Sequence, residues 1–130
     1  MTDEPLWLSV GEVLAVHGRQ LAEHGGGERL RDAGLLDSAV SRPQCTWQYG
    51  DPHPDLAALA ASLAFGLISN HPFVDGNKRT GYVCCRLFLR VNGADLIATP
   101  DEKYLMFYAI AAGEHREAEL ADWLRQHLTS

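Results

Sequence analysis

Apolar residues recur every three to four positions along most of the chain, the spacing that places them on one face of a helix. The predicted helices cover residues 10–24, 35–40, 55–70, 77–92, 100–112 and 117–128. The run over 55–70 is apolar on almost every side, as expected of a helix at the centre of a molecule. Capping signals support two of the starts, Ser9 with Glu12 and Thr99 with Glu102.

The segments between these helices lack a clear strand pattern, because no alternation of apolar and polar residues persists beyond a few positions. An all-α domain of about six helices is therefore predicted. The glycine triplet 25–27 is interpreted as the end of the first helix and a turn. Pro43 is expected to end the short second helix. The segment 45–54, which carries Trp47 but no helical period, is interpreted either as a flap loop that docks the substrate or as a loop that its aromatic residues anchor over the core.

Length and composition fit one domain over residues 1–130. The chain has 130 residues, of which 46% are hydrophobic and 22% charged, and these are ordinary values for a domain with its own core. Eleven Lys and Arg against 17 Asp and Glu give a net charge of −6. A protein that neutralises nucleic-acid phosphates is expected to be basic on at least one face. Direct nucleic-acid binding is therefore disfavoured, whereas a local cationic pocket for one small anion is not.

The cysteines and the N-terminal residues bear on the compartment. Three cysteines cannot all pair within the chain, and Cys84 and Cys85 are adjacent in an apolar helical run, where free thiols act as small hydrophobes. The first residues are acidic, unlike those of a signal peptide, and no apolar stretch is long enough to span a bilayer. We expect a cytoplasmic protein without a membrane partner.

One stretch between the two long apolar helices carries an unusual density of polar chemistry. It reads His71-Pro72-Phe73-Val74-Asp75-Gly76-Asn77-Lys78-Arg79-Thr80-Gly81. A connection between helices needs only turn-forming residues. Taken singly, each of these residues has an ordinary structural interpretation as a turn, a cap or a solvated helix start. An imidazole, a carboxylate, an amide and two cations within nine residues instead predict a site.

The predicted site suits phosphate chemistry. Asn77 is expected to cap the next helix, so that the backbone N–H groups of the first turn point at an anion. Lys78 and Arg79 add positive charge there, which is unfavourable next to the positive end of a helix unless an anion binds. Asp75 is a hard oxygen ligand that suits Mg²⁺. The imidazole of His71 can take a proton from a hydroxyl near neutral pH. Together these groups supply what phosphoryl or nucleotidyl transfer requires.

The segment 71–79 resembles the signature of the Fic/Doc superfamily, in its Doc (death-on-curing) branch. The similarity extends to residues 21–43 and to the helices that follow Phe88, and so covers nearly the whole chain. The resemblance implies a compact six-helix Fic fold and the toxin of a toxin–antitoxin pair. It also implies a protein kinase that uses ATP and Mg²⁺ to phosphorylate a threonine of a translation elongation factor, which stops protein synthesis.

The resemblance also assigns roles to the residues of the segment. The catalytic residues would be His71 as general base, Asp75 as the Mg²⁺ ligand or the carboxylate that orients the nucleophile, and the cations Lys78 and Arg79. The nucleotide-binding residues would be Phe73 as apolar anchor of the loop, with Gly76, Asn77, Lys78 and Arg79 at the phosphates. An inhibitory helix with the family's Ser/Thr-to-Glu pattern is not found in the sequence, so a separate antitoxin is expected to restrain the toxin.

Two departures from the wider Fic pattern favour the kinase. Fic adenylyltransferases have glycine where this chain has Lys78, and a second arginine where it has Tyr82. Both differences match the Doc branch. They favour the kinase, because the position of the phosphates decides which bond breaks. Transfer of AMP to a hydroxyl remains the second interpretation. A catalytically silent helical module that binds a partner is the third, and the presence of His71 argues against it.

Overall fold

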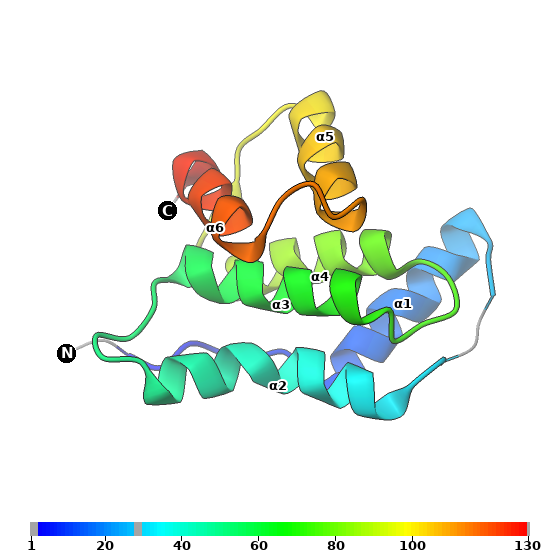
Figure 1. Cartoon of the computed structure of the whole chain (residues 1–130), viewed down its shortest axis with the longest axis horizontal. Coiled ribbons are helices and arrows are strands. Elements are labelled where there is room, and N and C mark those ends of the chain that lie inside the picture. The colour runs from blue at the N-terminus through cyan, green and yellow to red at the C-terminus, as the bar shows by residue number, and fades with distance from the viewer. Residues whose placement is uncertain (1–2, 28–29, 130) are drawn as a thin grey trace.

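The computed structural model describes residues 3–27 and 30–129, and within them the chain forms six helices and one short pair of strands (Figure 1). The helices are α1 (Val10–His24), α2 (Ala33–Tyr49), α3 (Leu56–Asn70), α4 (Asn77–Val91), α5 (Pro100–Ala111) and α6 (Glu117–His127). The strands β1 (Asp95–Leu96) and β2 (Leu128–Thr129) pair antiparallel. The prediction of an all-α fold of about six helices is confirmed.

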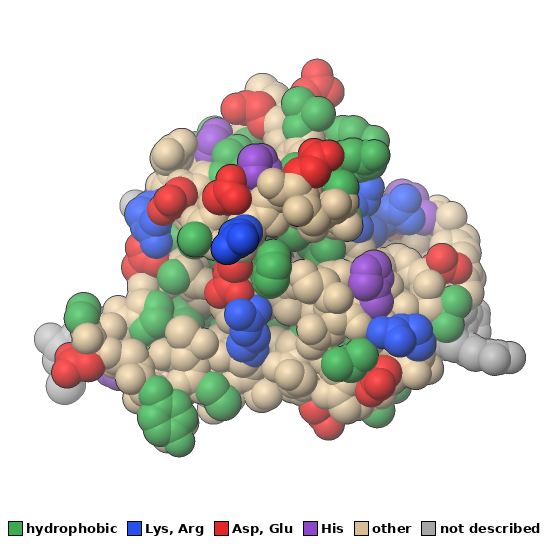
Figure 2. Space-filling view, viewed as in Figure 1, with side chains coloured by type: hydrophobic (Ala, Val, Ile, Leu, Met, Phe, Trp, Pro, Cys, Tyr) green, Lys and Arg blue, Asp and Glu red, His purple; other side chains and the backbone are tan. Residues whose placement is uncertain are grey.

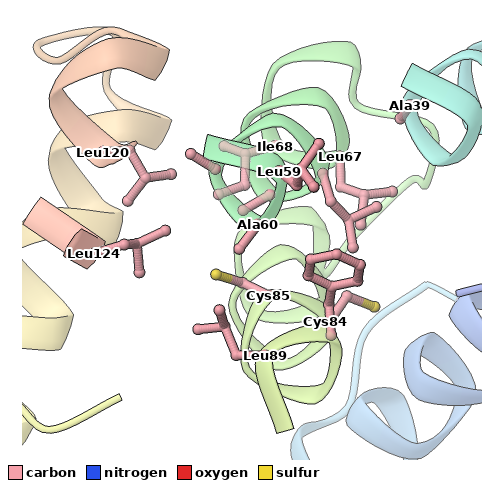
Figure 3. Packing of buried hydrophobic residues seen from close by; sticks show 14 of the residues in the cluster. Ala39, Leu59, Ala60, Leu67, Ile68, Cys84, Cys85, Leu89, Leu120 and Leu124 are labelled. Atoms are coloured by element: carbon pink, nitrogen blue, oxygen red, sulfur yellow. The ribbon is translucent and has the colours of Figure 1, made fainter. Parts of the chain in front are cut away.

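Helix α3 forms the centre of the molecule. It packs against α2, α4 and α6, and most of its residues are buried. Figure 3 shows its side chains between those of α6 and α4, with Ala39 of α2 nearby. Two glycines allow this close packing. A Cβ on Gly66 would lie 3.2 Å from the Cα of Ala39, and one on Gly81 of α4 would lie 2.7 Å from Ile68 Cγ1.

The adjacent thiols belong to this core, as predicted. Cys84 and Cys85 are buried free cysteines on α4, and burial raises the pKa of each thiol to about 12. The third cysteine, Cys45, is exposed. Among the described residues, none of the helices combines the length and the hydropathy needed to cross a membrane.

The prediction for the second helix and the flap is wrong. Helix α2 continues through Pro43 to Tyr49, so that the first half of the predicted flap, residues 45–49, is helical. Packing stabilises this continuation, because Trp47 lies edge-on to Trp7 and stacks on His53 at a ring distance of 3.9 Å. The remaining loop leads into the N-terminus of α3. The 15 residues of α3, about 22 Å of helix, separate that loop from His71. The segment 45–54 therefore lies at the wrong end of α3 to dock a substrate.

A cluster of charges fixes the exit from α4. Asp95 of β1 accepts hydrogen bonds from Arg86 and Arg90, each at 3.1 Å, and from the Leu96 N–H at 2.7 Å. These donors, Arg86 foremost, hold the pKa of Asp95 well below its usual range. The strand pair was not predicted, because two residues are too few to show an alternating pattern.

Candidate active site

The connection between α3 and α4 makes two sharp turns that place its side chains around a bend. His71 ends α3 in the left-handed conformation, with φ 49°, and Gly76 precedes α4 at φ 81°. Gly76 is the N-cap of α4 and carries no side chain to bond the first turn. The prediction that Asn77 caps this helix is therefore wrong, since Asn77 is already its first residue. The first N–H groups of α4 have no side-chain cap, as an anion site requires.

Asn77 instead holds the connection together from inside. Its side-chain oxygen accepts from the Phe73 N–H at 3.0 Å, and its amide nitrogen donates to the Phe73 carbonyl at 2.9 Å. These two bonds fix the orientation of the amide. The same nitrogen lies 3.3 Å from Nδ1 of His71, so the amide also orients the imidazole. The predicted role of Asn77 thus changes from helix cap to brace of the histidine.

The contact with Asn77 bears on the tautomer of His71. An amide N–H that donates to Nδ1 leaves the imidazole hydrogen of the neutral ring on Nε2. For Nε2 to accept a proton, the ring must hold its hydrogen on Nδ1 and give up that contact. The His71 side chain is exposed, and Nε2 has no protein partner among the described residues. The imidazole is therefore accessible to a substrate.

Phe73 anchors the connection in the core. Its side chain is only 1% exposed and stacks on the imidazole of His17, with ring centroids 3.6 Å apart. The Nε2 of His17 lies 2.8 Å from the Asp75 carbonyl, and because a carbonyl only accepts, Nε2 donates this bond. The phenyl ring can thus support a nucleotide only through the loop that it holds. In the sequence, His17 is distinguished only by its place on the apolar face of α1.

Residues 30–32, which precede α2, bind the other side of the connection. Arg31 donates from Nε to the His71 carbonyl at 2.6 Å and from Nη2 to the Asn70 carbonyl at 2.8 Å. This places a planar cation on the free carbonyls at the C-terminus of α3, where positive charge is favourable. The N–H groups of Arg31 and Asp32 both donate to the Pro72 carbonyl. Arg31 has no signal in the sequence, because its partners lie about 40 residues away.

The glycine triplet does more than end α1. The Gly27 N–H donates to Oδ2 of Asp75 at 2.9 Å, so the carboxylate ties the triplet to the connection. A Cβ on Gly26 would lie 3.3 Å from the Asp75 Cβ, and one on Gly27 would lie 3.2 Å from Val74 Cγ1. Only residues without a side chain allow this approach. Gly25 ends the helix as predicted, at φ 76°.

A hollow of about 390 Å³ lies at the N-terminus of α4. Its walls come from the end of α1, two glycines of the triplet, and residues 75–79. Every residue of the predicted site except His71 and Phe73 lines it. His71 joins the group through Asn77, and Phe73 through the buried stack described above. The structure therefore brings the predicted residues together around one bend.

Lys78 and Arg79 extend from the first turn of α4. The Nζ of Lys78 lies 5.3 Å from the ring of Tyr104 and 5.5 Å from that of Tyr108, both on α5. Arg79 is exposed. On the face in Figure 2, Lys and Arg side chains are interspersed with acidic and apolar ones, which is the scattered pattern expected from the sequence. The positive charge of Lys78 and Arg79 is thus a local feature of the site and not part of a larger basic surface on the face in Figure 2.

The donor set fits a nucleotide with Mg²⁺ rather than a metal held by protein alone. Asp75 offers one exposed carboxylate beside uncapped N–H groups, and Mg²⁺ is commonly held by one carboxylate together with phosphates and waters. No group of three or more His, Cys, Asp or Glu that could hold a metal occurs within residues 3–27 and 30–129. Asp75 would hold the ion, and the α4 N-terminus the phosphates.

The fold and this bend define the class of protein. The Fic/DOC family model matches residues 7–89, and the chain belongs to that family. Among curated proteins it is similar to "Toxin Doc" of Mycolicibacterium smegmatis (strain ATCC 700084 / mc(2)155), with 48% identity over 77 residues, and to "Protein kinase doc" of Escherichia phage P1, with 31% identity over 119 residues. The first match covers 59% of each chain. The second covers 92% of this chain and 93% of the phage protein.

Proposed function

We propose that the chain is a Doc-type toxin, a kinase that transfers the γ-phosphoryl group of ATP to a protein hydroxyl. One observation carries the proposal: the exposed imidazole of His71 lies beside the uncapped N-terminus of α4, which bears Lys78 and Arg79. The names of the two relatives, a toxin and a protein kinase, support it. A general base, an anion site and a carboxylate for Mg²⁺ are the parts that phosphoryl transfer needs.

In this mechanism His71 accepts the proton of the substrate hydroxyl at Nε2. The hydroxyl oxygen forms a bond to the γ-phosphorus, the bond from that phosphorus to the bridging oxygen breaks, and ADP leaves. The N–H groups of the first α4 turn and the fork of Arg79 hold the phosphate oxygens. Asp75 holds Mg²⁺, which neutralises phosphate charge when bound. In the tautomer that accepts this proton the contact of Nδ1 with Asn77 is given up, and Asn77 then supports His71 through its two hydrogen bonds to the Phe73 backbone.

The proposal extends to the substrate and the partner. The acceptor is a threonine of a translation elongation factor, whose phosphorylation stops protein synthesis, and the toxin then acts in the cytoplasm. A cognate antitoxin restrains it by covering the site. These assignments rest on the resemblance to Doc toxins, and the toxin name of one relative supports them.

The test compares ATP labelled at the γ-phosphorus with ATP labelled at the α-phosphorus. The purified chain is incubated with each nucleotide, Mg²⁺ and a translation extract. We expect label on one protein from γ-labelled ATP only, and loss of this label by at least about 100-fold in His71→Ala, the size of a general-base contribution. Tyr49→Ala, at an exposed site on α2, is the matched control.

Each alternative gives a different result in the same assay. Transfer from α-labelled ATP alone identifies an adenylyltransferase and contradicts the kinase. Equal growth arrest by wild type and His71→Ala, without label from either nucleotide, identifies a silent module that acts by binding. Induced expression of the two proteins in a bacterial host gives this second readout.

A further inference from the structure

The ammonium of Lys78 lies over two aromatic rings of α5. Its Nζ is 5.3 Å from the ring centroid of Tyr104 and 5.5 Å from that of Tyr108. The two tyrosines are four residues apart on one helix, and their rings stack with centroids 5.9 Å apart. Both side chains remain exposed, at 60% and 50%. A pair of surface tyrosines on one helix thus contacts a cation that belongs to another helix.

Helix α5 is anchored, so the fold itself sets the position of the tyrosine pair. Thr99 and Glu102 form a capping box at the start of the helix. Phe107, which precedes Tyr108, is 3% exposed and lies edge-on to Tyr82 of α4, with ring centroids 5.1 Å apart. The rings over Lys78 are therefore carried on a helix that packs against α4 itself.

The location of Lys78 explains why its ammonium benefits from aromatic partners. Lys78 is the second residue of α4, where the positive end of the helix disfavours a cation. The face of an aromatic ring is electron-rich and attracts an ammonium within about 6 Å of the ring centroid. Among the residues that the structure describes, no carboxylate forms an ion pair with Lys78. The tyrosine pair thus offsets an unfavourable charge at the start of α4.

This contact also bears on the candidate anion site. Lys78 lines the hollow at the N-terminus of α4 and a second hollow, of about 400 Å³, between α4 and α5. Of these two hollows, Tyr104 lines only the second. The rings therefore hold the ammonium on the α5 side of the uncapped N–H groups, beside the space for an anion. A side chain that is already held loses less conformational entropy when a ligand binds.

We propose that Tyr104 and Tyr108 are positioning residues that hold Lys78 ready for the phosphates at the N-terminus of α4. The inference rests on the proposed function, because it concerns the anion site of that reaction. The rings act through the ammonium and need no contact with the nucleotide. Their effect should therefore extend to any polyphosphate, whether or not it carries a nucleoside.

A double-mutant cycle tests the coupling between the rings and Lys78. Calorimetry measures the affinity for tripolyphosphate, which has the phosphates without a nucleoside. The leucine variant, Tyr104→Leu with Tyr108→Leu, keeps apolar bulk but removes both ring faces. We expect its affinity to be about three- to tenfold lower than that of wild type, the effect of two exposed cation–π contacts. Lys78→Met should also weaken binding, and the leucine variant should cause no further loss in that background.

Two controls accompany the cycle. The phenylalanine variant, Tyr104→Phe with Tyr108→Phe, keeps both ring faces and should bind tripolyphosphate within about twofold of wild type. Tyr49→Leu, at an exposed site on α2 that lines neither hollow, should bind as wild type does. Thermal unfolding of each variant checks that any loss of binding is not a loss of folding.

The outcomes separate the inference from the proposed function. If Lys78→Met weakens binding but the leucine variant does not, the anion site stands and the role of the rings is overturned. A loss in the leucine variant that persists in the Lys78→Met background also overturns it, since the rings then act without the ammonium. If the cycle behaves as expected but wild type transfers no phosphoryl group from γ-labelled ATP, the inference stands and the proposed function fails. If wild type does not bind tripolyphosphate, both fail.

NMR of the free protein tests the contact without any ligand. Protons that lie over the face of an aromatic ring are shielded, so the Cε protons of Lys78 should resonate upfield of their usual position. Lys78→Met identifies their signal. The upfield shift should persist in the phenylalanine variant and disappear in the leucine variant. A signal at the usual position in wild type would show that the rings do not hold the ammonium.

Steady-state kinetics show which substrate the tyrosine pair serves. In the leucine variant the KM for ATP should rise severalfold, while the KM for the protein acceptor stays the same. The phenylalanine variant should restore the KM for ATP. A rise confined to the KM for the acceptor would show that the rings contact the acceptor and would contradict the inference.

Discussion

At the scale of single residues, most side chains that hold the bend are different from those that act in it, and Asp75, which accepts from the Gly27 N–H, is the exception. His71 and Arg79 are exposed, whereas the groups that position them are tied to the backbone. Asn77 braces Phe73, Arg31 binds the carbonyl of His71, and His17 donates to the carbonyl of Asp75. The geometry of the proposed reaction therefore depends also on side chains, such as those of Arg31 and His17, that have no part in the proposed chemistry.

His17 gives the sharpest test of the idea that residues outside the reaction position the groups that act in it. His17→Leu keeps an apolar side chain of similar bulk against Phe73 but removes the donor to the Asp75 carbonyl. Loss of this bond lets the loop shift, and misplacement by about 1 Å can cost about 100-fold in rate. We expect kcat for the transfer reaction to fall about 10- to 100-fold, with a smaller change in the KM for ATP. Rates measured over a range of ATP concentrations separate the two.

The control for this prediction restores the donor. His17→Gln can donate from its amide, and part of the lost kcat should return although the stack on Phe73 is weakened. Thermal unfolding of both variants checks that the loss is not one of folding. Equal kcat in His17→Leu and wild type would show that the bond does not position the loop.

The residues of the candidate site could be picked out from the sequence, whereas the residues that support them could not. His71, Asp75, Lys78 and Arg79 lie within nine residues, so their density alone marks a site. The bond of His17 spans 58 positions and those of Arg31 span about 40. Such pairs meet only after α1 and the segment before α2 have packed on the connection. A single sequence carries no periodic signal for them.

At the scale of helices and strands, capping boxes predicted where helices begin, whereas a proline did not predict where a helix ends. Helices α1 and α5 begin where their capping boxes lie, with Ser9 and Thr99 as N-caps. Helix α2 shows the opposite case, because Pro43 indicated an end and the helix continues to Tyr49. Tertiary packing of Trp47 against Trp7 outweighs the local cost of the proline. The failed flap prediction has this same cause.

The contact of α3 with α4 depends on a missing side chain. The Cβ of Gly81→Ala would approach Ile68 Cγ1 to 2.7 Å and the Ala64 carbonyl oxygen to 3.3 Å, so the helices must separate or Ile68 must change rotamer. We expect the free energy of unfolding to fall by about 1–3 kcal/mol, as for other overpacked cores. Denaturant unfolding followed by circular dichroism measures the change.

Gly18→Ala is the matched control, because Gly18 lies in α1 with nothing within 4 Å of its Cβ position. That substitution should raise the stability by up to about 1 kcal/mol through helix propensity alone. If both substitutions stabilise the protein by the same amount, the close packing at Gly81 does not limit the core.

The link between α4 and β1 makes stability depend on pH. The pKa of Asp95 is lowered in the folded protein, first by the hydrogen bond from Arg86 and then by the Leu96 N–H. The unfolded chain thus binds a proton more readily, and stability falls as the pH drops below about 4. We expect the free energy of unfolding of Asp95→Asn to be about 1 kcal/mol lower than that of wild type at pH 7. As the pH falls, the variant should lose less stability than wild type.

Denaturant unfolding at several pH values between 7 and 3 checks this expectation. Asp37→Asn replaces an exposed carboxylate that makes no side-chain hydrogen bond or ion pair among the described residues, and it should keep the acid dependence of wild type. An acid profile of Asp95→Asn parallel to that of wild type would refute the role of this carboxylate.

At the scale of the whole molecule, α3 connects the candidate site at its C-terminus to α6 at its N-terminus. Its C-terminus ends in His71, and its N-cap, Asp55, binds Arg125 of α6 at 2.6 and 3.0 Å. This pairing, foremost the hydrogen bond from Arg125, lowers the pKa of Asp55. The hollow at the α4 N-terminus is itself built from segments on both sides of α2 in the sequence. A ligand there must bridge parts of the chain that separate on unfolding.

This arrangement predicts stabilisation by the nucleotide of the proposed reaction. A ligand that binds only the folded state adds about 2.7 kcal/mol at 100 times its Kd, which raises the Tm of a domain of this size by about 10 °C. We expect such a rise with ATP and Mg²⁺ in wild type, and in Tyr49→Ala as control. In Arg79→Ala at the same ATP concentration the rise should shrink severalfold, because a phosphate contact is lost while the core is untouched. Differential scanning calorimetry measures the Tm of each protein with and without ATP, and an undiminished rise in Arg79→Ala would place the nucleotide away from the α4 N-terminus.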